Sequence, residues 1–137
     1  PLENKIREAA DTYSRIGIVE DFLIKRITIP NDIHFKIIKD SVNTLSVPIP
    51  GITIKNTAEK FSLSERQFER IFNDYVGLPP KSFAEIMRFK QAFCLLQKET
   101  DLTRVSYSAG YYDQSHFIRT FKKFSGYTPG GYLKLAG

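Results

Sequence analysis

Cysteine is nearly absent from this sequence, which holds a single thiol at Cys94. One cysteine cannot close an internal disulfide, so the composition fits a reducing compartment such as the cytoplasm. No apolar run approaches the roughly 18 residues that a membrane-spanning helix needs. We therefore expect a soluble protein without a membrane partner.

Groups that carry catalysis or bind metals are also scarce. No glycine-rich phosphate loop and no spaced pair of acidic residues occurs. Ser115 and His116 are adjacent, but neighbours on a helix do not face one another, so they do not form a nucleophile and base. His34 and His116 have no cysteine or carboxylate cluster at ligand spacing. We expect no enzyme, no metal site and no cofactor, and we interpret Cys94 as a small buried core residue.

The excess positive charge is confined to one part of the chain. Of the net charge of +5, residues 1–50 contribute nothing, with seven Lys or Arg and seven Asp or Glu, whereas residues 51–137 carry thirteen against eight. A basic region of this kind commonly binds a polyanion, although a solubilising surface explains the same charge.

What the basic region does contain is a repeat. Residues 64–80 and 113–129 match at an offset of 49 residues. The identical pairs are Phe68 and Phe117, Arg70 and Arg119, Phe72 and Phe121, Gly77 and Gly126, and Pro80 and Pro129. The pairs that agree in kind are Ser64 and Asp113, Tyr75 and Phe124, and Phe83 and Tyr132. A repeat this dense predicts two copies of one helical unit.

Hydrophobic periodicity predicts helices almost throughout. In the first part of the chain they are expected at residues 3–14, 19–27 and 33–45, with breaks at Gly17 and Pro30. Asn31 or Asp32 caps the third of these helices. The following stretch, with Pro48 and Pro50, cannot continue a helix and connects it to the repeat.

Each copy of the repeat is predicted to be a helix, a turn and a second helix. In the first copy the helices cover about residues 54–60 and 65–75, in the second about 102–109 and 114–124. Ser64 and Asp113 cap the second helices, and Gly77 and Gly126 end them. Pro80 begins a long joining helix that runs to about Lys98. Its predicted buried residues are Phe83, Ile86, Met87, Phe89, Ala92, Phe93, Leu95 and Leu96.

Helical geometry divides each second helix into a buried face and a free face. The buried faces hold Phe68, Ile71, Phe72 and Tyr75, and Phe117, Thr120, Phe121 and Phe124. The free faces hold Arg66, Glu69, Arg70 and Asn73, and Ser115, Ile118, Arg119 and Lys122. Arg66 and Arg70 repel each other at a cost of about 0.2 to 0.5 kcal/mol, which a polyanion along that face would remove. Ile118 on a polar face suits a thymine methyl group.

One run resembles the signature of the AraC/XylS family of transcription regulators: AGYYDQSHFIRTFKKFSGYTP, residues 109–129. The first copy agrees through Ala58, Ser64, Arg70, Phe72, Gly77, Pro80, Arg88, Phe89, Ala92 and Leu96. The sequence departs from the family at Ser106, where alanine is usual, at Tyr111, where phenylalanine is frequent, and at Phe61 and Ser62, where a turn glycine is common.

The resemblance covers about residues 31–137 and implies an all-α, seven-helix DNA-binding domain. Its two helix-turn-helix units, at about 53–76 and 102–125, are joined by the long linker helix. In the family such a domain usually follows a sensing or dimerising domain. The sequence begins at Pro1, so we expect that domain to precede it, to hold any effector ligand, and to continue into residues 1–30 as a tail or helical linker.

The function that the resemblance implies is sequence-specific binding of double-stranded DNA by a cytoplasmic, nucleoid-associated bacterial regulator, with recognition helices at 64–75 and 113–124. The expected base contacts are Arg66, Glu69, Arg70, Ser115, Ile118 and Arg119. The expected phosphate contacts are Gln67, Asn73, Gln114, His116, Lys122 and Lys123. An activator also touches RNA polymerase, which adds a second expected partner. The alternative is a protein-interaction module that binds polymerase or a regulator, with DNA binding incidental.

Overall fold

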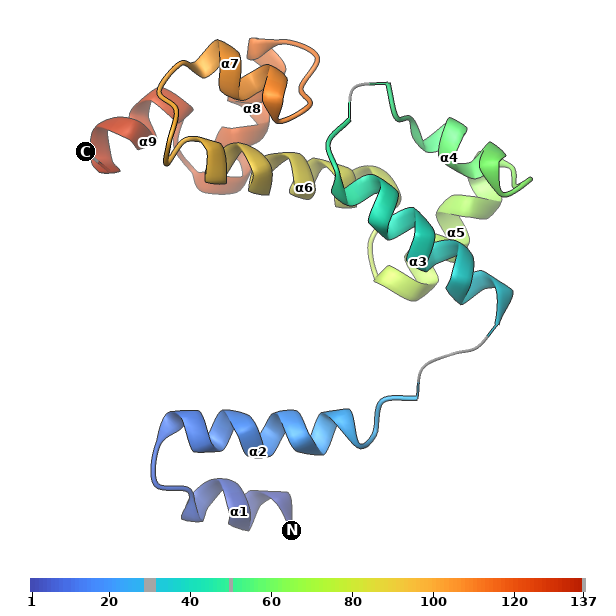
Figure 1. The fold of residues 1–137 in the computed structure, drawn as a ribbon, viewed down its shortest axis with the longest axis vertical. Helices are drawn as coiled ribbons and strands as arrows, with labels where there is room; N and C mark the ends of the chain where they lie inside the picture. The colour runs from blue at the N-terminus through green and yellow to red at the C-terminus, as the bar shows by residue number, and fades with distance from the viewer. Residues whose placement is uncertain (29–31, 50, 137) are drawn as a thin grey trace. The chain divides into compact units, whose positions relative to one another are not determined.

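The computed structural model describes residues 1–28, 32–49 and 51–136, and within them every regular element is an α-helix (Figure 1). The predicted all-α fold class is therefore confirmed. The chain divides into two compact units, Pro1–Asn31 and Asp32–Gly137. Pro30 and Asn31, predicted as a helix stop and a cap, and Pro50 of the predicted connection lie outside the described residues. No helix in the described part of the chain is long and apolar enough to cross a membrane.

The first unit is a pair of helices, α1 (Leu2–Glu8) and α2 (Thr12–Ile24), which pack against each other. The predicted helix over residues 3–14 was wrong, because α1 ends at Glu8 and Gly17 lies inside α2. Asp11 caps α2 by accepting the Ser14 N–H at 2.8 Å. One interior glycine costs a helix about 1 kcal/mol, and a capping aspartate of about the same value offsets it.

The second unit contains seven helices in its described residues. They are α3 (Ile33–Ser46), α4 (Ile54–Lys60), α5 (Glu65–Val76), α6 (Pro80–Leu95), α7 (Leu102–Ser108), α8 (Gln114–Ser125) and α9 (Pro129–Ala136). Asp32 caps α3 by accepting the Phe35 N–H at 2.8 Å. α3 and α4 pack on α5, α7 and α9 pack on α8, and α6 joins the two groups (Figure 1). The prediction of two helix-turn-helix units joined by a long helix is confirmed.

Two separate hydrophobic clusters hold this unit together. The first core consists of Ile38, Leu45, Ala58, Phe68, Ile71 and Phe72. The second core consists of Ala92, Leu96, Val105, Ala109, Tyr111, Phe117 and Phe121. α6 contributes to both, because Phe83 packs against the first core while Phe89 and Phe93 pack against the second.

α6 is shorter and less buried than predicted. It ends at Leu95 rather than near Lys98, and in the turn that follows the N–H groups of Lys98 and Glu99 both donate to the Leu95 carbonyl, each at 2.9 Å. Ile86 is 37% exposed and Cys94 is exposed, so the interpretation of Cys94 as a buried core residue was wrong. A helix that passes between two cores turns a different face to each, and a single periodic stripe does not describe it.

Candidate nucleic-acid interface

The second helix of the first helix-turn-helix unit, α5, begins with a capping box. The Ser64 hydroxyl accepts the Gln67 N–H at 3.3 Å, and the Gln67 side-chain oxygen accepts the Ser64 N–H at 3.1 Å. Gly77, at φ +83°, ends the helix in the left-handed conformation. Phe68 and Phe72 are fully buried. One side of α5 is therefore fixed in the first core, and the other side is available to a partner.

The free face of α5 is cationic. Its exposed residues are Arg66, Glu69, Arg70 and Asn73. Arg66 and Arg70 border one shallow hollow together with Ser64 and Gln67. Within the described residues no carboxylate lies within 4.0 Å of either guanidinium. Two like charges one helical turn apart repel each other, so an anionic partner would stabilise this surface.

In the second helix-turn-helix unit, α8 has the same construction as α5. The Asp113 carboxylate accepts the His116 N–H at 2.7 Å, and Gly126, at φ +80°, ends the helix. The side chains that fix α8 on its core are Phe117, Thr120 and Phe121. The exposed residues of the opposite face are Gln114, Ser115, Arg119 and Lys122. In the part of the chain that the structure describes, no carboxylate lies within 4.0 Å of Arg119 or Lys122.

Three predicted contact residues of α8 have protein neighbours. Ile118 is half-buried and packs against the second core, so its predicted place on the free face was partly wrong. It follows Phe117 by only 100° of helical rotation, which puts it on the flank of α8. The Lys123 Nζ lies 3.0 Å from the Glu85 carboxylate on α6. The His116 ring is half-buried and stands edge-on to Tyr111, with ring centroids 5.3 Å apart.

Two aromatic residues predicted in the cores lie at their edges. Tyr75 is 39% exposed and Phe124 is 36% exposed. Each lies in the last turn of its helix, where the core ends. The Phe124 ring packs on Phe89 at 5.3 Å between centroids, whereas the Tyr75 hydroxyl bonds to Asp32. The prediction that both are buried was therefore wrong. Phe124 still packs against an aromatic ring, whereas Tyr75 makes a polar contact.

The turns of the two helix-turn-helix units differ in length by one residue. An equivalent backbone hydrogen bond of 3.1 Å, N–H to carbonyl, joins Leu63 to Ala58 and Tyr111 to Ser106. These partners are 48 residues apart, whereas the caps Ser64 and Asp113 are 49 apart, so Tyr112 is the extra residue. Tyr112 is 89% exposed and immediately precedes the cap of α8. It was not among the predicted contacts, although the change of offset was visible in the sequence.

The hydroxyl groups of Ser106 and Tyr111 are buried in the second helix-turn-helix unit, and neither has a hydrogen-bond partner in the described residues. At both positions the sequence departs from the signature that it resembles. Serine replaces alanine at residue 106 and tyrosine replaces phenylalanine at residue 111, and each replacement adds a side-chain oxygen atom. Burial raises the pKa of the Tyr111 hydroxyl to about 12, with Arg88 opposing the shift and Glu85 adding to it. The two substitutions therefore preserve the shape of the core but leave polar atoms unsatisfied.

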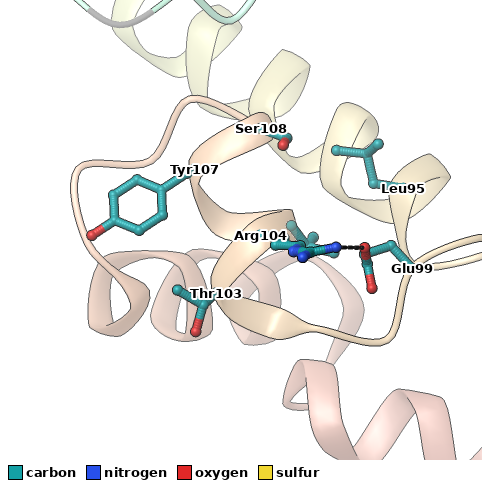
Figure 2. Close-up of a pocket in the computed structure, with 7 residues that line it drawn as sticks. Leu95, Glu99, Thr103, Arg104, Tyr107 and Ser108 are labelled. Carbon is teal, nitrogen blue, oxygen red and sulfur yellow. Dashed lines mark ion pairs between the residues drawn. The ribbon is translucent and has the colours of Figure 1, made fainter.

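A separate hollow lies beside α7 (Figure 2). Arg104 pairs there with Glu99 at 3.6 Å and with Asp101 at 3.7 Å. Figure 2 shows the Arg104 side chain directed at Glu99, with Tyr107 turned away from this pair. Because its one arginine is already neutralised, the hollow is a poor site for a polyanion. In the described ranges no three His, Cys, Asp or Glu side chains come together to hold a metal ion.

The same arrangement occurs in known proteins. A family model described as a helix-turn-helix domain matches residues 57–135. The chain is 32% identical over 73 residues to the HTH-type transcriptional activator RhaS of Escherichia fergusonii, a match that covers 53% of this chain and 26% of that protein. The chain thus spans about a quarter of the length of that relative.

Two solved structures share the fold. One is the C-terminal domain of AraT, a response regulator from Geobacillus stearothermophilus, with a TM-score of 0.68, 22% identity, and coverage of 72% of this chain and 84% of that chain. The other is the DNA-binding domain of the transcriptional factor AdpA in complex with a target DNA, with a TM-score of 0.64, 20% identity, and coverage of 77% and 93%.

Proposed function

The chain belongs to the AraC/XylS family of bacterial helix-turn-helix transcription regulators, and we propose that it binds a specific sequence of double-stranded DNA through α5 and α8. The observation that carries the proposal is a pair of capped helices, each fixed by aromatic residues on one side. On the other side α5 bears two arginines and α8 bears one, and none of them has a carboxylate partner among the described residues. AdpA, whose DNA-binding domain was solved with a target DNA, has the same fold, which supports the proposal.

The base contacts in this proposal come from the free faces. Arg66, Arg70 and Arg119 each present a guanidinium that suits the two acceptors of a guanine edge, a pairing worth about 1 to 3 kcal/mol of discrimination. Glu69 accepts from a cytosine amino group. Ser115 bonds to a base edge, and the exposed part of Ile118 contacts a thymine methyl group. Because α8 has Ser115 and Ile118 where α5 has Arg66 and Glu69, we expect the two half-sites to differ.

The proposed phosphate contacts orient the helices without reading sequence. They are Gln67, Asn73, Gln114, His116, Lys122 and Lys123. The Gln67 side-chain oxygen is occupied by Ser64, which leaves its amide N–H groups to donate to a phosphate. Lys123 reaches a phosphate by leaving Glu85. The backbone N–H groups at the starts of α5 and α8 add to this attraction.

The length of α6 is relevant to whether α5 and α8 can enter adjacent major grooves. α6 has 16 residues and spans about 24 Å at 1.5 Å per residue. Successive major grooves on one side of B-DNA lie about 34 Å apart. The long side chains of Arg70 and Arg119 extend the reach of α5 and α8 toward that spacing.

The proposal also names partners outside the duplex. RhaS is described as an activator, and by analogy we propose that this chain activates transcription and contacts RNA polymerase. Because the match covers only 26% of RhaS, we propose that any effector ligand binds a part of the protein outside residues 1–137. A regulator of chromosomal genes works beside the chromosome, so we assign it to the cytoplasm, in association with the nucleoid.

The test is selection of bound duplexes from a randomised pool, followed by binding measurements at increasing salt. We expect a two-part site of unlike halves about one helical turn apart, and an affinity that falls steeply with salt. Failure to enrich any duplex over bulk DNA at moderate salt would end the claim of specificity. Substitutions that abolish binding of a protein partner but leave duplex binding intact would favour the interaction module.

A further inference from the structure

Among the described residues, a second contact besides α6 joins the two halves of the chain that hold the helix-turn-helix units. α6 is the covalent connection, and it contributes side chains to both cores. The second place is the connection between α3 and α4, where Pro48 meets Gly110. A β-carbon added to Gly110 would lie 2.8 Å from the Pro48 carbonyl oxygen and 2.9 Å from the Pro48 β-carbon. Such distances are shorter than any ordinary contact of a β-carbon, so Gly110 and Pro48 lie against each other with no room for a methyl group.

Both sides of this contact are anchored in a core. On the Pro48 side, Leu45 belongs to the first core and Ile52 packs against it. On the Gly110 side, Ala109 and Tyr111 belong to the second core. Displacement of Pro48 relative to Gly110 therefore requires displacement of one core relative to the other.

Arg88 of α6 lies next to the contact. It borders one hollow with Pro48 and Ile52, and a second hollow with Gly110 and His116. The contact thus lies beside α6 and not along its axis. A single helical rod permits some bending and twisting between the bodies at its two ends, whereas a second contact away from the rod restricts both motions.

We propose that the Pro48–Gly110 contact fixes the orientation of α8 relative to α5 and so sets the number of base pairs between the two half-sites. This rests on the proposed function. Each added base pair moves a half-site by about 3.4 Å along the duplex and about 35° around it. A rigid pair of recognition helices matches one such spacing, and a loosened pair accepts several.

The experiment uses the two-part duplex that the wild-type chain selects from a randomised pool, together with duplexes one base pair shorter and longer. We expect the wild type to discriminate against the altered spacings, and Gly110→Ala to reduce that discrimination about tenfold, within the range of couplings between contacting groups. Pro48→Gly removes the ring without altering the turn at Gly110, and it should reduce the discrimination in the same direction.

Gly126→Ala is the matched control. Gly126 has nearly the same φ as Gly110, +80° against +77°, but a β-carbon there meets nothing within 4 Å. It therefore carries the same backbone strain without the collision, and it should lower the melting temperature while keeping the spacing preference. Binding to a duplex with only the α8 half-site shows whether the turn of each variant is intact.

The outcomes separate the two claims. A wild type that enriches no duplex from the pool overturns the proposed function, and this inference with it. A wild type that selects a duplex but accepts every spacing overturns this inference alone. A wild type with one preferred spacing that Pro48→Gly and Gly110→Ala both retain overturns this inference alone. Should Gly110→Ala lose half-site binding as well, the Pro48→Gly result decides.

Discussion

The Tyr75 hydroxyl donates to the carboxylate of Asp32, at 2.9 Å from Oδ1 and 2.8 Å from Oδ2. The same carboxylate accepts the Phe35 N–H at 2.8 Å and caps α3. Tyr75 lies in the last turn of α5, and its ring centroid is 6.4 Å from that of Phe35. One aspartate therefore ties the end of the first recognition helix to the start of α3.

Acid should weaken this tie. The Phe35 N–H and then the Tyr75 hydroxyl lower the pKa of Asp32 below its ordinary value of 3.8. A carboxyl group whose pKa is lower in the folded state contributes stability above its unfolded pKa and loses that contribution as pH falls through the folded pKa. We expect Tyr75→Phe to lower the urea midpoint at pH 7 and to lose less stability than the wild type below about pH 4. Tyr127→Phe, at another exposed tyrosine, is the control, and identical acid profiles for all three proteins would contradict the prediction.

Removal of the unsatisfied hydroxyl groups of Ser106 and Tyr111, in the second helix-turn-helix unit, should not lower the stability of the fold. We expect Ser106→Ala and Tyr111→Phe each to keep or raise the free energy of unfolding, by up to about 1 kcal/mol, because each removes a buried polar atom that has no partner among the described residues. Ser125→Ala is the contrasting variant, since the Ser125 hydroxyl donates to the Phe121 carbonyl at 2.8 Å, and it should be destabilised. Urea unfolding measures all three.

Tyr111 also predicts an alkaline transition. Its pKa is raised to about 12, so its stability contribution is complete below its ordinary pKa of 10 and is lost as pH rises toward 12. The wild type should lose more stability than Tyr111→Phe across this interval. A Tyr111 absorbance titration with a midpoint at 10 in the folded protein would exclude a buried phenol.

The arginines of the two recognition helices should read different half-sites. Arg70→Ala and Arg119→Ala should each relax base preference at one position by about 1 to 3 kcal/mol, each within its own half-site. Repeating the duplex selection with each variant measures this. Arg15→Ala, on α2 of the first unit, provides the control, and a variant with an unchanged selected sequence would remove that arginine from the base contacts.

Lys122 should contribute affinity without specificity. Lys122→Ala should weaken binding by similar factors on the selected duplex and on an unrelated one, and it should reduce the slope of log affinity against log salt by about 0.9. Fluorescence anisotropy titrations at several salt concentrations measure both quantities. A change in the selected sequence would instead make Lys122 a base contact.

Glu85 should restrain duplex binding by holding Lys123. Glu85→Gln releases the ammonium group from its 3.0 Å ion pair, and because the Lys123 side chain is 63% exposed, folding should lose no more than about 1 kcal/mol. We expect tighter binding to every duplex and a steeper dependence on salt. Glu20→Gln on α2 changes the net charge equally at an exposed carboxylate that has no ion pair within the described residues, and it is the control. Equal gains for the two variants would show a general charge effect and no specific role for Lys123.

Much of the second unit could be predicted because its signals are local. A cap such as Ser64 or Asp113 satisfies backbone N–H groups two or three residues away, and Gly77 ends its helix through its own φ. The assignment of Phe68 to the core and Arg70 to the surface follows from 3.6 residues per turn. The same locality explains why all the free-face residues except Ile118 were correctly placed as exposed.

The wrong predictions concern positions where two sequence signals act on the same helix, or where a residue lies beyond the end of a core. Gly17 was predicted to break a helix, but the cap at Asp11 lies far enough upstream for α2 to form around it. Cys94 was predicted to be buried because α6 is apolar on more than one side. Tyr75 lies on the inward side of α5 but beyond the end of the first core, where its hydroxyl reaches Asp32.

Most helices of the second unit, the caps at Ser64 and Asp113, the repeat and most residues of the two free faces were predicted from the sequence, because each depends on residues within one or two helical turns. The end of α6 and the place of Ile118 were not. Three relationships were visible only in the folded chain: Tyr75 bonds to Asp32, Lys123 is paired with Glu85, and Gly110 lies against Pro48. Each of them joins residues far apart in the chain. They depend on how the helices pack on two separate cores, and helical periodicity carries no information about that packing.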